Sequence, residues 1–195
     1  MIILGLTGSI GMGKTTTAGF FEEAGIPVYN ADRAVHELYE NKEVIENLSR
    51  IFPHCLTDGR IDRSKLSKTI VRDPAKLVLL EKFIHPLVRK KEKDFVKMHR
   101  DRGDPLVVLD IPLLFEKGPQ GRVDKIAVVS APTGIQRQRV LARSGWDDEK
   151  LDRILSRQIS DEEKRRRADF IIDTGKSLDD ARQQVKHLIS RLIGK

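Results

Sequence analysis

The chain has 195 residues, 39% of them hydrophobic and 33% charged, a balance that predicts one folded domain and excludes an intrinsically disordered protein. The formal net charge of +7 favours anionic partners, but aromatic residues make up only 5% and none is interleaved with basic runs, so we expect no nucleic-acid stacking surface. Cys55 is the only cysteine, which excludes an intrachain disulfide and favours a cytoplasmic protein in which this residue is buried.

Short apolar runs separated by helical segments predict an α/β architecture. The first run, residues 2–6, is too short for a signal peptide or a membrane span. Helices are predicted over 13–24 and 177–193 from their apolar spacing. Strands are predicted, in chain order, at 2–6, 26–29, 106–110, 125–129 and 170–172. Because helices separate the strands, we expect a five-stranded parallel sheet with helices on both faces.

Two helical stretches interrupt this alternation. Residues 31 to about 101 show apolar spacings of three and four without a convincing strand, which predicts a helical subdomain over about 31–102. Residues 133–167 are helical and highly charged, with a middle too polar for a core, which predicts a mobile lid. We therefore expect a single domain over 1–195 whose core is formed by 1–30, 103–132 and 168–195.

The segment from Gly8 to Thr15 satisfies the phosphate-loop pattern G-x-x-x-x-G-K-[ST]. It follows a predicted buried strand and opens a predicted helix, so its backbone N–H groups and the helix N-terminus can surround phosphate oxygens. Lys14 should reach the β- and γ-phosphates, and the Thr15 hydroxyl should bind Mg²⁺. The residues expected to bind ATP here are Gly8, Gly11, Met12, Gly13, Lys14, Thr15 and Thr16. The pattern predicts an ATP-dependent phosphotransferase, the alternative being a glycine-rich turn with an accidental lysine.

The residues after the other strands narrow the class of phosphate-loop protein. A switch GTPase needs D-x-x-G after the third strand and an N-K-x-D motif, but Asp110 is followed by Ile-Pro-Leu and no N-K-x-D occurs, so a small-molecule kinase is favoured. Asp110 ends an apolar run either as a carboxylate that binds Mg²⁺ or as a polar strand end. Asp32 follows the second strand, and its position alone leaves two roles open, a base for the acceptor hydroxyl or a helix N-cap.

The predicted lid contains several arginines of the kind that stabilise charge during phosphoryl transfer. Any one of them could instead belong to a solvated helix face, but a lid that closes over ATP should contribute at least one. The candidates are Arg137, Arg139, Arg143, Arg153 and Arg157.

Motifs spread over nearly the whole chain resemble those of the dephospho-CoA kinases, which use ATP to phosphorylate the ribose 3′-hydroxyl of dephospho-CoA in the last step of coenzyme A synthesis. The phosphate loop is the most specific of them, and the order and spacing of the others add to it. These motifs are GLTGSIGMGKT at the start, NAD at 30–32, DGRIDRSKL at 58–66, IHP at 84–86, DIPLLFE at 110–116, QRQRVLAR at 136–143, RILSRQ at 153–158 and ADFIID at 168–173.

The resemblance implies a P-loop NTPase fold with roles for particular residues. It makes Asp32 the general base, Arg143 the lid arginine that contacts the transferring phosphate, and Arg139 an ATP-binding arginine one helical turn earlier. It assigns the span 31–102 to substrate binding, with His85 either touching substrate or holding a structural place at a helix start. The implied ligands are ATP, Mg²⁺ and dephospho-CoA, and we expect a cytoplasmic monomer that binds neither nucleic acid nor a membrane.

Three departures from the family pattern qualify the resemblance. Asn30 stands where the family has the first Asp of D-A-D, which leaves Asp32 as the only carboxylate there. Met12 replaces a common Ser, and we expect little effect because this position contributes mainly backbone. Asp173 replaces an Asn after the last strand, which could alter nucleotide affinity or preference. Two alternative functions stay open, another small-metabolite kinase and a basic ATP-binding protein that regulates or binds nucleic acid.

Overall fold

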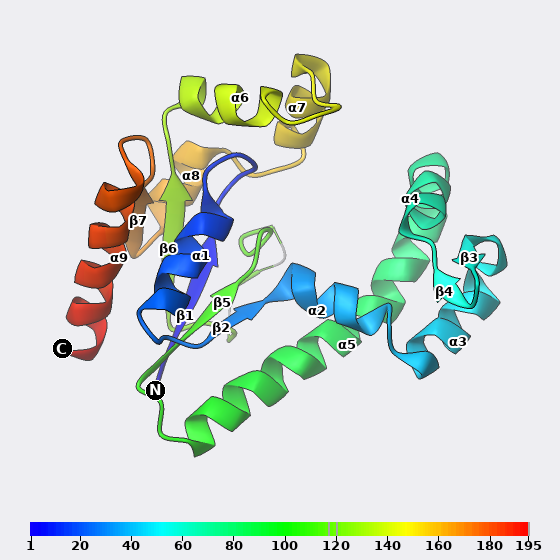
Figure 1. Cartoon of the computed structure of the whole chain (residues 1–195), viewed down its shortest axis with the longest axis horizontal. Helices are drawn as coiled ribbons and strands as arrows, with labels where there is room; N and C mark the ends of the chain where they lie inside the picture. The colour runs from blue at the N-terminus through cyan, green and yellow to red at the C-terminus, as the bar shows by residue number, and fades with distance from the viewer. Residues whose placement is uncertain (117, 120, 195) are drawn as a thin grey trace. The chain divides into compact units, whose positions relative to one another are not determined.

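The computed structural model of the chain describes residues 1–116, 118–119 and 121–194, and Figure 1 traces its course. The chain divides into two compact units. One is formed by Met1–Asn30 together with Val96–Lys195, and the other by Ala31–Phe95. The first unit carries the central sheet, and the second is mainly helical.

The first unit is built on a five-stranded parallel sheet, which confirms the predicted fold class. Its strands are β1 (Ile2–Thr7), β2 (Val28–Asn30), β5 (Leu106–Asp110), β6 (Lys125–Ser130) and β7 (Phe170–Asp173). Their order in the sheet is β2-β5-β1-β6-β7, so that β1 lies at the centre between β5 and β6. Parallel strands in this order turn all their carboxyl ends toward one edge, where the phosphate loop follows β1.

Two helices cover one face of this sheet. The helix α1 (Lys14–Glu23) and the helix α9 (Leu178–Ile193) pack beside each other there (Figure 1). Alternate residues of the strands meet them, because successive side chains of a strand point to opposite faces. The resulting core includes Leu4, Leu6, Phe20, Phe21, Leu106, Val108, Ala127, Val129, Ile172, Val185 and Leu188.

Between β6 and β7 the chain forms three short helices, α6 (Thr133–Leu141), α7 (Asp148–Leu155) and α8 (Asp161–Arg167). The first turn of α7 is capped by Asp147, and that of α8 by Ser160. The segment is not polar throughout, because Leu151 in its middle is fully buried. Its last helix, α8, contacts β6 and so packs against the sheet.

The second unit has its own small core. It contains α2 (Ala31–Leu38), α3 (Lys42–Ile51), a 3₁₀ turn (Pro53–Cys55), α4 (Arg63–Arg72) and the larger part of α5 (Pro74–Asp101). Leu48 is fully buried at the centre of this core and Cys55 is nearly so, which confirms the buried cysteine. The other buried members are Leu38, Val44, Phe52, Leu66, Leu80 and Ile84.

The prediction of no strand between 31 and 101 is wrong in one place. Two short strands, β3 (Leu56–Thr57) and β4 (Arg60–Ile61), form an antiparallel hairpin in the second unit. Asp58 and Gly59 at its turn both have positive φ, 49° and 72°, as a tight two-residue turn requires. The Asp-Gly pair was therefore a readable hairpin signal that the helical periodicity around it concealed.

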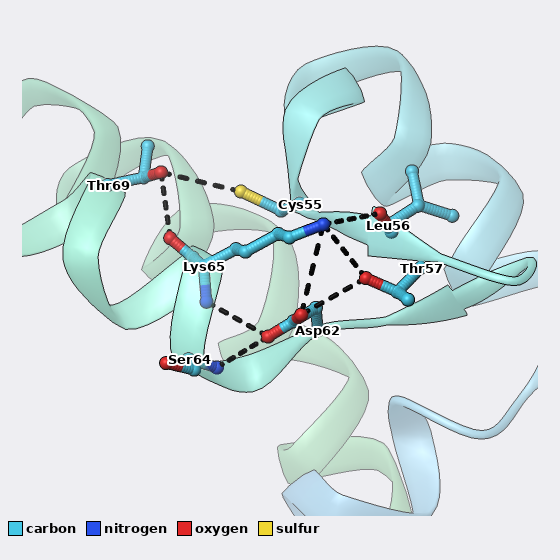
Figure 2. Close-up of polar contacts among 7 residues, drawn as sticks. All are labelled: Cys55, Leu56, Thr57, Asp62, Ser64, Lys65 and Thr69. Atoms are coloured by element: carbon cyan, nitrogen blue, oxygen red, sulfur yellow. Dashed lines mark hydrogen bonds and ion pairs between the residues drawn. The ribbon is translucent and has the colours of Figure 1, made fainter.

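Figure 2 shows how this hairpin is joined to the start of α4. Asp62 caps the helix, because one carboxylate oxygen accepts hydrogen bonds of 3.0 Å from the backbone N–H groups of Ser64 and Lys65. The other oxygen accepts a bond of 3.0 Å from the Thr57 hydroxyl, and the Lys65 ammonium donates to the same hydroxyl over 2.9 Å. The hydrogen bond from the Lys65 backbone lowers the pKa of Asp62 below its ordinary value. The cap and the hairpin thus form one polar cluster.

Candidate active site

The phosphate loop runs from the end of β1 to the start of α1. Gly11 and Gly13 have φ values of 79° and 85°, which side chains rarely adopt, and Gly13 stands immediately before the first residue of α1. Gly8 is needed for a different reason, since a Cβ there would lie 2.6 Å from the backbone oxygen of Val129. The glycines of the pattern are therefore fixed by backbone geometry and by close approach to β6.

We expect Gly8→Ala to destabilise the chain by about 1–3 kcal/mol, because the added methyl group must displace backbone at β6. Gly19→Ala is the matched control, since Gly19 lies in α1 with nothing within 4 Å of its Cβ position. There the change should stabilise the helix by up to about 1 kcal/mol. Chemical unfolding of the two variants measures the difference, and equal stabilities would contradict the close approach at Gly8.

Lys14, the first residue of α1, meets the end of β5. Its ammonium donates to Asp110 Oδ1 over 2.5 Å, and the Asn30 side-chain amide donates to Asp110 Oδ2 over 2.8 Å. The Asp110 side chain is fully buried and that of Lys14 is 13% exposed. Both oxygens of a buried carboxylate are thus bound by groups at the ends of neighbouring elements. The Asn30 departure fits this arrangement, because a second carboxylate at that position would repel Asp110 instead of donating to it.

The side chains of three further residues at the loop differ in their exposure to solvent. Thr15 and Thr16 are exposed in the first turn of α1, as expected of side chains that bind a ligand. Met12 is buried in the core, where its sulfur accepts a hydrogen bond of 3.2 Å from the Ala131 N–H. The Met12 side chain thus packs under the loop and away from solvent, and the expectation that this position serves the phosphate site mainly through its backbone stays a prediction.

A pocket of about 320 Å³ opens beside the phosphate loop. It lies within the first unit and is bounded by the loop, by the start of α1, by α6 and by the connection from β7 to α9. Its lining residues are Gly11, Gly13, Thr16, Thr17, Phe20, Arg139, Arg143, Thr174, Lys176, Ser177, Leu178 and Ala181. The pocket joins polar groups and one aromatic ring next to a phosphate-binding loop, a combination suited to a nucleotide.

The structure separates the predicted lid arginines by their partners. Arg137 is bound within the lid to Asp148 and Asp152, and the hydrogen bond to Asp152 is the larger of the causes that raise the pKa of its guanidinium. Arg153 is likewise paired with Glu149. Neither lines the pocket. These two arginines serve the lid itself.

Arg139 and Arg143 both line the pocket, but they differ in whether their guanidinium groups are hydrogen-bonded. Arg139 donates to the Thr174 hydroxyl over 3.0 Å and to the Thr174 carbonyl over 2.7 Å. Arg143 is exposed and makes no side-chain hydrogen bond or ion pair with residues 1–116, 118–119 and 121–194. Arg139 is thus held in place, whereas the guanidinium of Arg143 has its donors available.

The connection from β7 to α9 contains a site residue that the sequence reasoning missed. The Thr174 hydroxyl donates to the Met12 carbonyl over 2.8 Å, so this residue joins the phosphate loop to Arg139. Its position directly after the fifth strand, at the carboxyl edge of the sheet, was the available signal. The preceding residue, Asp173, accepts a hydrogen bond of 2.7 Å from the Gly175 N–H and shapes this turn.

Asp32 and His85 belong to the second unit and are described within it. Asp32 is the second residue of α2, so it lies inside the first turn instead of capping the helix. Its carboxylate is exposed and has no hydrogen bond or ion pair among the described residues. His85 lies 3.6 Å from Glu81 in the middle of α5, which continues through Pro86. The predicted helix start at His85 is therefore wrong.

Comparisons with known proteins identify a family that this chain resembles over nearly its whole length. A family model described as dephospho-CoA kinase matches residues 2–180. A dephospho-CoA kinase from Mesorhizobium japonicum is 54% identical over 194 residues, covering 100% of this chain and 98% of the relative, and one from Bartonella quintana is 50% identical over 193 residues, covering 99% of each.

Two solved structures are similar to this chain over nearly its full length. The crystal structure of TT1252 from Thermus thermophilus has a TM-score of 0.82 at 39% identity and covers 98% of this chain and 97% of its own. A dephospho-CoA kinase from Campylobacter jejuni has a TM-score of 0.71 at 26% identity and covers 99% and 98%. Among the described helices, none has the length and apolar character needed to span a membrane.

Proposed function

The chain belongs to the dephospho-CoA kinase family, and we propose that it transfers the γ-phosphate of ATP to the ribose 3′-hydroxyl of dephospho-CoA, with Asp32 as base. ATP-dependent phosphorylation of dephospho-CoA in coenzyme A biosynthesis is the function of this family and of this chain. The observation that carries the residue roles is the phosphate loop at the carboxyl edge of the parallel sheet, with Lys14 and Asp110 beside it. A large part of the catalysis is positioning and charge stabilisation.

The phosphate loop supplies the fixed donors for ATP. Its backbone N–H groups and the N-terminus of α1 receive the phosphates, and Lys14 contributes a positive charge to the β- and γ-phosphates. The ammonium of Lys14 is bound to Asp110 in this structure, so a nucleotide must share or replace that partner. The pocket beside the loop, with Arg139 held on Thr174, is the proposed place of the rest of the nucleotide.

The residues present fit a magnesium ion bound together with ATP. Mg²⁺ takes oxygen ligands and commonly uses only one or two protein groups besides phosphate and water. Exposed Thr15 carries a hydroxyl oxygen and Asp110 two carboxylate oxygens. Thr15 directly follows Lys14 in the sequence, and Asp110 is the ion-pair partner of Lys14. When bound, the ion would neutralise charge on the phosphates during transfer. Thr15 and Asp110 are therefore the proposed groups that hold it.

Asp32 is the proposed acceptor of the ribose hydroxyl proton. Its carboxylate is exposed without a partner in the described part of the chain, so both oxygens are available to a substrate. It follows Asn30 by two residues, and chain geometry alone keeps the two Cα atoms within about 7 Å. Asn30, the last residue of β2, in turn donates a hydrogen bond to Asp110. His85, exposed on α5, is proposed only as a contact for the acceptor.

We expect Arg143→Ala to lower kcat about 10- to 100-fold, the worth of one or two charge-assisted hydrogen bonds to the transferring phosphate. Its folding should be unaffected, because Arg143 makes no side-chain bond within the described chain. Arg153→Ala is the control within the same lid, since Arg153 forms an ion pair with Glu149 on its own helix and does not line the pocket. Steady-state assays of both variants decide the point, and equal kcat values would remove Arg143 from the site.

The proposed function is tested by incubating the chain with Mg·ATP and dephospho-CoA and separating the products by chromatography. Formation of CoA with matching ADP is the expected result. Formation of ADP with another acceptor, such as a nucleoside or a sugar acid, and none with dephospho-CoA would favour a different small-metabolite kinase.

We also propose that the enzyme works in the cytoplasm as a monomer, and its single cysteine agrees with a reducing compartment.

A further inference from the structure

A fully buried lysine lies beneath the phosphate loop. Lys164 belongs to the basic run 164–167, which forms the second half of α8. Its neighbours in this run are exposed, but Lys164 itself has 0% exposure. Lysine is almost never fully buried unless it is paired. The position therefore requires a specific reason.

The ammonium of Lys164 has two partners from distant parts of the chain. It lies 3.1 Å from Glu116 Oε1 and donates a hydrogen bond of 3.2 Å to the Ser9 hydroxyl oxygen. The same oxygen of Glu116 accepts a bond of 3.0 Å from the Ile159 N–H, near the start of α8. The other oxygen, Oε2, is buried without a hydrogen bond among the described residues. Lys164 thus balances a buried carboxylate and at the same time reaches the phosphate loop.

Ser9 is the point at which this pair meets the loop. It is 5% exposed, and its carbonyl accepts a hydrogen bond of 3.2 Å from the Met12 N–H, which closes the turn of the loop. The next residue, Ile10, is also held from the lid segment. The Gln136 side chain donates to its carbonyl over 2.7 Å, and Gln158 Oε1 accepts from its N–H at 3.4 Å. Side chains from the 133–167 segment therefore fix one side of the loop.

We propose that Lys164 is a positioning residue, which holds Ser9 so that the backbone N–H groups of the loop stay aligned for the phosphates of the nucleotide. A buried ion pair is a poor means of stabilising a fold, because desolvation offsets much of the attraction and apolar pairs often do as well. The hydrogen bond from Lys164 to Ser9 is directional, so it can fix the position of the loop, which an apolar pair could not do. The inference rests on the proposed binding of ATP by this loop and names a residue outside it that sets its shape.

The decisive variant is the double substitution Lys164→Met with Glu116→Gln. Removing only the lysine would leave a buried carboxylate without its cation and could prevent folding. In the double variant both charges are gone, and the Gln oxygen can still accept from Ile159. We expect a thermal midpoint close to that of the wild type but a Kd for Mg·ADP raised about tenfold, the worth of one charge-assisted hydrogen bond. The KM for dephospho-CoA should not change.

Two single variants complete the test by calorimetric titration with Mg·ADP. Ser9→Ala removes the acceptor and leaves the ion pair in place, so it should raise the Kd in the same direction in a folded protein. Arg165→Met is the matched control, because Arg165 is exposed on the same helix, and its Kd should equal that of the wild type. A folded double variant with wild-type Kd would overturn the proposal, and so would a wild-type Kd for Ser9→Ala. Failure of the proposed function is read separately, from the absence of CoA formation by the wild type.

Discussion

Replacement of Lys14 by methionine is expected to lower kcat for CoA formation by about 10²–10³-fold, the usual cost of losing one preorganised charge at a developing negative charge. Methionine keeps most of the side-chain length but cannot interact with the β- and γ-phosphates. Lys186→Met is the control, because Lys186 is exposed on α9 and does not line the pocket beside the loop. Steady-state kinetics of the two variants gives the comparison, and a Lys14 variant as active as the control would refute the assignment.

The structure adds a second effect to this substitution. Lys14 forms an ion pair with the fully buried Asp110, and removing one partner of a buried pair typically costs about 3–5 kcal/mol of stability. Folding must therefore be checked by chemical unfolding before the kinetics are interpreted. The double variant Lys14→Met with Asp110→Asn removes both charges and should recover part of the lost stability. Its turnover should stay low, which would separate loss of catalysis from loss of folding.

Asp32→Asn is expected to lower kcat by about 10²–10⁴-fold, because general base catalysis contributes about that much and an amide cannot accept the proton. The Kd for Mg·ATP should be unchanged, since Asp32 is not among the residues that line the pocket beside the phosphate loop. Calorimetric titration with nucleotide, beside the steady-state assay, measures both quantities. The substitution is nearly isosteric, so the fold should be retained.

Glu40→Gln is the matched control for Asp32→Asn. Glu40 is exposed in the turn after α2, and its replacement removes the same charge from the same unit. Its turnover should equal that of the wild type. If Asp32→Asn were as active as this control, the carboxylate would be left with the lesser role of favouring the N-terminus of α2 through its charge.

The sheet and the phosphate loop could be predicted because their signals are local. Each strand is a short apolar run between glycines, prolines or polar residues, and the predicted run 106–110 coincides with β5. The loop is a fixed pattern whose glycines are imposed by φ at Gly11 and Gly13. Such features depend on backbone geometry within a few residues, so the sequence contains them directly.

What could not be predicted depends on contacts between distant segments. Lys164 looks like the arginines that follow it, and only the fold brings its ammonium to Ser9, 155 positions away in the chain. Thr174 likewise becomes a site residue because the sheet order places the end of β7 near the loop that follows β1. The helix-start alternative for His85 was wrong, because α5 runs through this position and contains Pro86 in its interior. For Lys164 and Thr174 the partner lies in another element, which local sequence patterns do not show.

Transfer of the γ-phosphate to the ribose 3′-hydroxyl is tested most directly by identifying the product made by the wild-type chain. The chain is supplied with Mg·ATP and dephospho-CoA, and the position of the new phosphate is read by phosphorus NMR against authentic CoA. The predicted result is one 3′-phosphorylated product in an amount equal to the ADP released. ADP with inorganic phosphate alone, or phosphate at another hydroxyl, would contradict the roles proposed for the phosphate loop and Asp32.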